Sequence, residues 1–300
     1  MAGVSPPCIL CCGEAVMDLV PLADGSDALL PVVGGAAVNC AVALSRLGVS
    51  VGFVGALSTD AIGERIFEHL LRQGVDTSLT HQSAKPSTLA VAQLLPDGIR
   101  FTLFDENSAG RSITTDQLPT IPKNTQALVF GGISLAHAPA AAAFELMITR
   151  AGRRVTWLDL NIRPSVIGDA EDYRARLIRM IRLASVVKVS DEDLDWFGPL
   201  PDLRDDQLLL HTCGAAGAEA RMGSWGCHVP APKVEVRDTV GAGDTFNAGV
   251  LASLVHSDVL GPMAKIDKPS LVAAIAFGVR AASFSVNHAG AHAPTQKEIE

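Results

Sequence analysis

Asp244 stands directly after a small, glycine-rich turn, Gly241-Ala242-Gly243, and a stretch of helical composition follows it. Side chains this small leave the backbone N–H groups uncovered, and such groups at a helix N-terminus converge on an anion that the helix dipole also attracts. A carboxylate is not needed to hold that anion, but it suits a base that takes the proton from a hydroxyl attacking a phosphate. The turn therefore predicts phosphoryl transfer, with Gly241, Ala242 and Gly243 as the anion hole and Asp244 as the catalytic base.

The same turn has a non-catalytic interpretation. Asp is a good N-cap and Gly is a common turn residue, so a helix-capping turn uses the same residue types. In the catalytic interpretation we expect the helix N-terminus to lower the pKa of Asp244 and make it a weak base. A loose transition state tolerates a weak base, because the hydroxyl proton leaves late.

Residues that suit a ligand with several hydroxyls lie near the N-terminus. Gly34 and Gly35 let a ligand approach the backbone just before a predicted helix, and Asn39 falls on the first turn of that helix. Asp18 is expected at the end of the first strand, where open α/β sheets bind their ligands. Its carboxylate would accept bonds from two neighbouring hydroxyls. The structural alternatives are a solvated loop aspartate and a capping asparagine.

Composition excludes several classes of partner. The 300 residues carry a formal net charge of −8, with 48% hydrophobic and 19% charged residues, enough for one large α/β domain or two smaller ones. Nucleic acid and anionic membranes need clustered Lys and Arg, so neither is expected. No apolar stretch reaches the ~18 residues of a membrane helix. Cys8, Cys11 and Cys12 lack a second ligand pair at finger spacing, which favours packed free thiols in a reducing cytoplasm.

A scaffold must bring these residues together, and the chain alternates short apolar runs with helical patterns. That alternation predicts an open, mostly parallel sheet with helices on both faces. The expected strands are 9–13, 51–55, 127–130, 155–160, 186–189 and 208–212. The expected helices are 36–47, 63–73, 139–151, 173–184, 244–256 and 271–286.

Two segments, 19–33 and 87–105, break the alternation. The second is typical of a hairpin, with strands 89–95 and 99–104 around a Pro96-Asp97-Gly98 turn. Strands outside the main alternation predict a small β-lid over the ligand cleft. An edge strand of this lid could pair across a two-fold axis, so a homodimer through the lid is left open.

Two strings in the chain resemble the signatures of the ribokinase-like (PfkB) carbohydrate kinases. DTVGAGD at 238–244 resembles the second signature, and GGAAVNCAVALSRLG at 34–48 resembles the first. The resemblance implies a single ribokinase-like kinase domain over 1–300, with a central, mostly parallel sheet flanked by helices and a small β-lid. It also implies transfer of the ATP γ-phosphoryl group to a sugar hydroxyl, with Mg²⁺ bridging the phosphates. A monovalent cation such as K⁺ is left open.

The resemblance assigns residues to both substrates. It places Asp18, Gly34, Gly35 and Asn39 in the sugar site. Thr212, Gly214 and Gly217 follow a predicted buried strand and resemble the TxGxxG nucleotide loop, and Gly241 and Gly243 would also touch the nucleotide. A TxGxxG pattern alone is weak support, because ordinary connections between strands use the same residues.

The metal-side motif departs from the family pattern. The family usually carries Asn-x-x-Glu after its Lys-containing strand, and here Ser190 and Asp193 occupy those positions. Asp is one methylene shorter, so Asp193 would reach the Mg²⁺ shell only through an added water or a shifted backbone. Glu192 is the rival carboxylate. An ordinary acidic helix start is the structural alternative.

The motif Asp159-x-Asn161-x-Arg163 resembles the fructokinase-like branch of the family, and so does the string Phe104–Ala109. Asn161 and Arg163 would face the cleft mouth, with Arg163 as a phosphate or substrate clamp. The resemblance therefore favours phosphorylation of D-fructose to fructose 6-phosphate. A 2-keto-3-deoxygluconate kinase and a ribokinase are the alternatives, and a sugar sensor without catalysis is a hypothesis of a different class.

Overall fold

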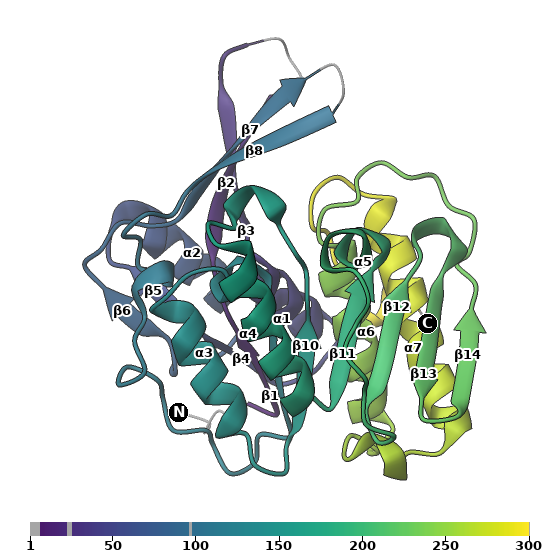
Figure 1. Cartoon of the computed structure of the whole chain (residues 1–300). Helices are drawn as coiled ribbons and strands as arrows, with labels where there is room; N and C mark the ends of the chain where they lie inside the picture. Colours follow the sequence, from purple (N-terminus) through teal and green to yellow (C-terminus); the bar gives the residue numbers. More distant parts are fainter. Residues whose placement is uncertain (1–6, 23–25, 96–97, 300) are drawn as a thin grey trace, which may run out of the picture.

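The computed structural model describes residues 7–22, 26–95 and 98–299. Its body is an eight-stranded sheet, in the order β14-β13-β12-β11-β10-β9-β1-β4 (Figure 1). Six of these strands match predicted ones: β1 (Ile9–Cys12), β4 (Val51–Val54), β9 (Ala127–Gly131), β10 (Val155–Asp159), β11 (Val186–Ser190) and β12 (Leu208–Thr212). All six run parallel to their neighbours in this set. The predicted α/β fold with a mostly parallel sheet is confirmed.

Helices cover both faces of the sheet because successive residues of its central strands point to opposite sides. Ile9 and Cys11 of β1 pack into one core, while Leu10 and Cys12 pack into the other. The first core is closed by α1 (Ala36–Arg46), α2 (Ala61–Arg72), α6 (Ala242–His256) and α7 (Lys268–Val286). The second is closed by α3 (Ala140–Thr149), α4 (Ala170–Leu183) and α5 (Asp191–Phe197). A last short helix, α8, spans Gln296–Ile299.

Helix α7 corrects one expectation from composition. This helix has 19 residues and a mean hydropathy of 1.5. By length and composition alone it could cross a membrane. In this fold it packs along α6, and Leu271 and Ile275 are fully buried in the first core. The apolar character of α7 therefore belongs to a core helix.

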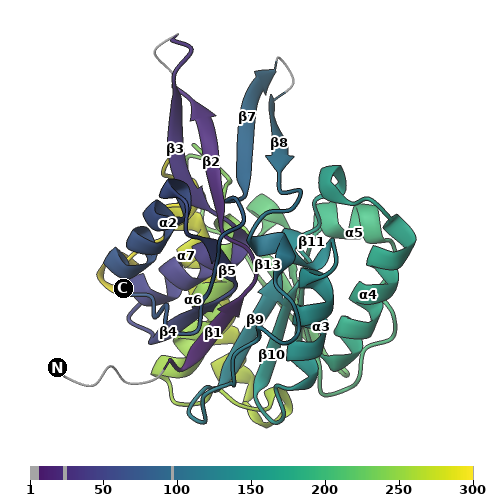
Figure 2. The ribbon, with the colours of Figure 1, turned by 90° about the vertical axis from the view of Figure 1, so that its left-hand side faces the viewer.

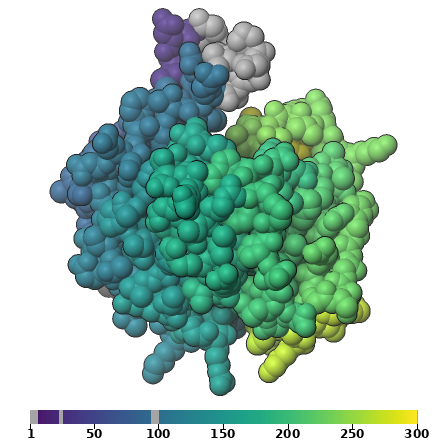
Figure 3. All heavy atoms as spheres, viewed as in Figure 1, coloured from purple at the N-terminus to yellow at the C-terminus, as the bar shows by residue number. Residues whose placement is uncertain are grey.

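A second sheet of four strands projects from the body (Figures 2 and 3). This small sheet contains β2 (Val16–Pro21), β3 (Leu29–Gly34), β7 (Leu89–Leu95) and β8 (Gly98–Phe104), in the order β3-β2-β7-β8. β7 and β8 form the predicted antiparallel hairpin, although Pro96 and Asp97 of its turn lie outside the described residues. β2 joins the two hairpins by pairing parallel to β7. A short pair, β5 (Ala56–Ser58) and β6 (His81–Ser83), lies apart from both sheets.

The sequence did not predict the antiparallel end of the main sheet, β13 (Ala218–Met222) and β14 (Trp225–Val229). β13 buries only Ala218, Ala220 and Met222 on its inner face. Small and polar residues of this kind give little strand propensity. The six cysteines are all free thiols. Of the three for which packed free thiols were predicted, Cys11 and Cys12 are buried and Cys8 is partly buried.

Candidate active site

The glycine-rich turn forms the N-terminus of α6, at the edge of the main sheet where the parallel strands end. Gly241 is its N-cap and has a left-handed backbone with φ of 74°. A Cβ at this position would lie 2.5 Å from the Cβ of Ala291, so the loop that contains Gly290 and Ala291 permits no larger residue. The first backbone hydrogen bond of the helix runs from Thr245 N to Gly241 O at 2.9 Å. The N–H groups of Gly243 and Asp244 precede that bond and are available to an anion.

One N–H group of the predicted anion hole is already engaged. Ala242 donates its backbone N–H to Thr239 O at 3.3 Å. Asp238 fixes the rest of the turn, because its carboxylate accepts from Val240 N at 3.0 Å and from Gly290 N at 2.8 Å. Asp238, the first residue of the DTVGAGD string, thus ties the turn to the loop that contains Gly290 and Ala291.

Asp244 lies where three elements meet. Its carboxylate accepts from Asn39 Nδ2, on the first turn of α1, at 3.0 Å, and from Asn161 Nδ2, just beyond β10, at 3.4 Å. Only 7% of Asp244 is exposed. Asn161 adopts a positive φ of 42°, a conformation that asparagine tolerates better than most residues. Two amides therefore hold one carboxylate in a fixed position at the sheet edge.

The pKa of Asp244 moves in the direction opposite to our expectation. Burial raises it to about 7, and the nearby Asp159 adds to the increase. The hydrogen bond from Asn39 and the charge of Lys188 act against this increase without cancelling it. The expected lowering by the helix N-terminus was wrong, because the cost of burying the charge outweighs the dipole. A carboxylate with this pKa is a better base near neutral pH than a solvated one.

A buried ion pair that the sequence did not predict lies beneath this carboxylate. Lys188 Nζ lies 3.2 Å from Asp159 Oδ1, and both side chains are at most 5% exposed. Asn247 of α6 donates to Asp159 Oδ2 at 2.7 Å and accepts from Trp157 Nε1 at 3.0 Å. The available signal was one charged residue in each of two buried strands, Asp159 at the end of β10 and Lys188 within β11. Burial disfavours the charge on Lys188, but the surrounding carboxylates outweigh it and raise its pKa.

Asp18 lies in a different element from the one expected. The first strand ends at Cys12, and Asp18 belongs to β2 of the small sheet, opposite Val32 and Ala90. Its carboxylate lies over Gly34, where a Cβ would approach Asp18 Oδ2 to 2.4 Å. Burial raises the pKa of Asp18 to about 6. Gly34 therefore makes room for this carboxylate, whereas a Cβ at Gly35 would lie 2.7 Å from the backbone oxygen of Glu14. The contact of both glycines with a sugar stays a prediction.

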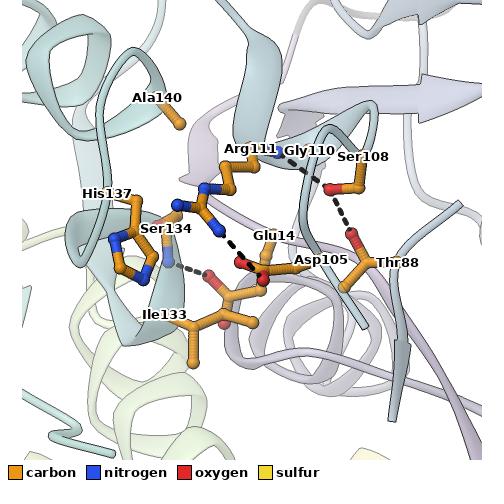
Figure 4. A pocket seen from close by; sticks show the side chains of 10 residues that line it. All are labelled: Glu14, Thr88, Asp105, Ser108, Gly110, Arg111, Ile133, Ser134, His137 and Ala140. Carbon is orange, nitrogen blue, oxygen red and sulfur yellow. Dashed lines mark hydrogen bonds and ion pairs between the residues drawn. The ribbon is translucent and has the colours of Figure 1, made fainter. Parts of the chain in front are cut away.

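A small polar cavity opens at the base of the small sheet (Figure 4). Glu14 lies on one side, where its carboxylate accepts from Ala36 N at 3.0 Å and Ser134 N at 3.1 Å. On the other side Arg111 pairs with Asp105 at 3.2 Å. The remaining lining residues are Thr88, Ser108, Gly110, Ile133, Ser134, His137 and Ala140. Asp18, Asn39 and Asp244 are not among the residues that line this cavity.

The predicted nucleotide loop follows β12 at the same edge of the sheet. Thr212 is the last residue of β12, and the loop is closed by bonds from Cys213 N to Gly217 O at 2.8 Å and from Gly217 N to Gly214 O at 3.1 Å. These bonds hold Thr212, Gly214 and Gly217 in one compact turn. Its contact with a nucleotide stays a prediction.

Asp193 has a structural role that the sequence did not predict. Its Oδ2 accepts from Ser190 N at 2.8 Å in a capping box that starts α5, and its Oδ1 accepts from Ile162 N at 2.7 Å. The residue is 2% exposed, whereas Glu192 is exposed. The shorter side chain thus ties the start of α5 to the loop after β10. A metal role for Asp193, or for its rival Glu192, stays a prediction.

Comparison with known proteins decides the family. The sequence profile of the pfkB family of carbohydrate kinases matches residues 7–298. The chain belongs to this family. A fructokinase of Rhizobium leguminosarum bv. trifolii is 41% identical to this pfkB kinase over 266 residues, covering 84% of the chain and 81% of the relative.

Two solved structures resemble the pfkB kinase over nearly its whole length. A fructokinase of Xylella fastidiosa with bound ATP superposes with a TM-score of 0.85 at 26% identity, covering 97% of this chain and 96% of that one. A fructokinase of Vibrio cholerae O395 in a form with fructose, ADP and calcium ion gives 0.84 at 25% identity, with 97% coverage of both chains. The pfkB kinase is therefore a sugar phosphotransferase of the fructokinase type with a ribokinase-like fold.

In this pfkB kinase the structure brings only some of the predicted residues into contact. Asp244, Asn39 and Asn161 form one hydrogen-bonded group. Arg163 is exposed, and its guanidinium donates to the carbonyl of Ile162 at 3.0 Å. The sequence analysis did not assign Glu14 to the site. The one signal for it was a charged residue within an apolar run. The catalytic and binding roles of the predicted residues stay predictions.

Proposed function

We propose that this chain is an ATP-dependent fructokinase that converts D-fructose to fructose 6-phosphate. The observation that carries the proposal is Asp244, a buried carboxylate held by Asn39 and Asn161 directly beside the helix N-terminus that would receive the phosphates. The Rhizobium and Vibrio relatives support fructose as the acceptor, and the ATP and ADP in the neighbouring structures support the donor.

In the proposed reaction Asp244 accepts the proton of the attacking hydroxyl as the γ-phosphoryl group is transferred. The N–H groups of Gly241, Gly243 and Asp244 stabilise the phosphate charge, and Ala242 contributes once its bond to Thr239 opens. Asp18, Gly34, Gly35 and Asn39 hold the sugar. Asn161 fixes the base and Arg163 lies at the mouth, while Thr212, Gly214 and Gly217 bind the nucleotide.

The small cavity adjoins the residues proposed to hold the sugar, because its Glu14 accepts from Ala36 N, next to Gly35. The charges around this cavity favour a neutral sugar. Among the described residues that line it, Glu14 and Asp105 are carboxylates and Arg111 is the only guanidinium. Asp105 already pairs with that guanidinium, so little positive charge remains for a sugar acid or a sugar phosphate. The acid 2-keto-3-deoxygluconate is therefore a weaker candidate substrate than fructose. Ribose, which is also neutral, is the second candidate.

A coupled assay of ADP release against D-fructose, D-ribose and 2-keto-3-deoxygluconate tests the proposal. We expect the highest kcat/KM with D-fructose. A higher value with either other sugar reassigns the substrate, and sugar binding without ADP release would identify a sensor.

Metal ions enter the proposal with the nucleotide. Mg²⁺ would neutralise the phosphate charge during transfer, with phosphate oxygens and water as its ligands. The buried carboxylate of Asp193 fits at most an indirect contact through water, because both of its oxygens already accept backbone N–H groups. Potassium and calcium are present in neighbouring Vibrio structures, which supports K⁺ as a further candidate.

We further propose that the small sheet is a lid on the sugar within one kinase domain. Its outer strands β3 and β8 expose Leu29, Leu30, Phe101 and Phe104. Open edges with apolar residues favour pairing with a second copy, so we propose a homodimer through the lid. The free cysteines support a cytoplasmic location.

The pH dependence of kcat/KM for fructose should report the two raised carboxylates. Asp244 must be ionised to act as the base, so activity is present above its pKa of about 7 and lost on acidification. We expect kcat/KM to fall about tenfold per pH unit below that value, and more steeply below the Asp18 pKa of about 6. Initial rates at low fructose, with saturating ATP and Mg²⁺, measure this. A profile that stays flat through neutral pH into the acid range would contradict it.

Asp18→Ala is expected to raise the KM for fructose and leave the KM for ATP nearly unchanged. Removing a charged acceptor from hydroxyl groups costs about 1.5–3 kcal/mol, or roughly 10- to 150-fold in KM. Steady-state kinetics with each substrate varied in turn measures the two constants. Asp27→Ala, an exposed aspartate next to the small sheet, is the control and should change neither. Equal effects of Asp18→Ala on both constants would assign Asp18 to folding or closure.

A further inference from the structure

Three side chains that phosphoryl transfer does not use meet beside the nucleotide loop. The ligand atoms of Asp191, His211 and Cys213 all lie within 4.8 Å of one another. His211 Nε2 is 2.7 Å from Asp191 Oδ1, with the two side chains 22% and 63% exposed. An imidazole, a carboxylate and a thiol thus share one accessible point on the surface.

The fold itself places these groups together. His211 belongs to β12 and Cys213 directly follows Thr212, the last residue of that strand. Asp191 follows Ser190, which pairs with Thr212 between them. The capping box of Asp193 fixes the start of α5 and with it the backbone of Asp191. β12 and the start of α5 thus hold His211 and Asp191, and backbone bonds to Gly217 and Ala216 hold Cys213, as a metal site requires.

The chemistry of the three groups selects one class of ion. Thiolate, imidazole and carboxylate together are ligands of Zn²⁺, with a tetrahedral fourth position left to water. Mg²⁺ prefers six oxygen ligands and does not suit this set. Ligand atoms around Zn²⁺ lie roughly 3–4 Å apart, given bonds of about 2.0–2.3 Å, so small movements of these side chains would complete the geometry. Binding releases the thiol proton as the zinc–sulfur bond forms.

We propose that Asp191, His211 and Cys213 form a binding site for Zn²⁺ or a similar divalent cation, and that the bound ion hinders binding of the nucleotide. Cys213 opens the predicted nucleotide loop: its N–H donates to Gly217 O at 2.8 Å and its carbonyl accepts from Ala216 N at 3.0 Å. An ion on Cys213 would fix this loop to β12 and α5. The expected result is a higher KM for ATP, and this second half rests on the proposed function.

Cobalt(II) tests the site without any substrate. Added to the metal-free, reduced protein, Co²⁺ bound to a thiolate gives a sulfur-to-metal absorption band in the near ultraviolet, and Zn²⁺ should displace it. Cys213→Ser should abolish the band. Asp191→Asn and His211→Gln should weaken Co²⁺ binding by at least about 10- to 100-fold. Cys227→Ser, in β14 of the same sheet, is the matched control and should keep the band. Circular dichroism confirms that each variant is folded.

The outcomes test the metal site and its effect on nucleotide binding separately. A wild type without the band, or a band that survives Cys213→Ser, overturns the site. If the band behaves as expected, the KM for ATP is measured with and without Zn²⁺ for wild type and for Cys213→Ser. The change that Zn²⁺ causes is taken for each protein relative to its own metal-free value. A Zn²⁺ effect on wild type alone supports the regulatory half, and equal effects or none overturn it. A protein without kinase activity would refute the proposed function while the cobalt result stands.

Discussion

Asp244→Asn is expected to lower kcat with fructose by at least about 100-fold while nucleotide binding is retained. The amide keeps the shape of the side chain but cannot accept the proton. Its NH2 group also replaces one of the two acceptor oxygens, so one of the two neighbouring amides must turn over to keep its hydrogen bond. Asn39 and Asn161 would still contact the side chain at this position. Steady-state kinetics and titration with a fluorescent ATP analogue measure the two properties.

The pH dependence provides an internal control for this variant. Wild-type Asp244 is protonated below its pKa of about 7, so the difference in rate between wild type and variant should shrink on acidification. The limb near neutral pH should be absent from the residual activity of the variant. Should Asp244→Asn turn over at near-normal rates, Asp244 is a cap of α6 and the base must be sought elsewhere.

Lys188→Met is expected to destabilise the protein by about 3–5 kcal/mol. The substitution leaves the carboxylate of Asp159, which is 3% exposed, without its cation. An unpaired charge at that depth costs far more than the side-chain contacts that are lost. Urea unfolding followed by circular dichroism measures the change.

Two further variants show whether the unpaired charge is the cause. Asp159→Asn combined with Lys188→Met removes both charges and should recover most of the lost stability. Arg72→Met breaks the exposed pair with Glu68, whose side chains are 65% and 66% exposed, and should cost less than about 1 kcal/mol. If Lys188→Met were as mild as Arg72→Met, the buried pair would contribute little to the fold.

The sequence predicted the elements well because their signals are local. Short apolar runs, separated by amphipathic stretches, were enough to predict β1, β4 and β9–β12 together with α1–α4. The short helix α5 was expected only as the alternative of an acidic helix start. β13 was missed because its alternation rests on two alanines and one methionine. Nothing within that segment shows that it is paired on both sides by β12 and β14.

The site was predicted less completely because its properties depend on distant partners. Asn39 and Asp244 are 205 positions apart, and their hydrogen bond follows from the meeting of α1 and α6. The pKa of Asp244 rises through burial and through Asp159, neither of which is visible in the motif. The aspartate in place of the family's glutamate was expected to bear on the metal, yet in the fold it holds a backbone turn.

The two carboxylates proposed for the reaction belong to different parts of the fold. Asp244 is fixed in a core helix, whereas Asp18 belongs to a strand that projects from the body. In the proposed mechanism the sugar held by Asp18 supplies the aligned nucleophile, so ATP bound alone would face water without one. This arrangement would suppress wasteful hydrolysis of ATP in the absence of sugar. The two-sheet architecture would then couple use of the phosphate donor to the presence of its proper acceptor.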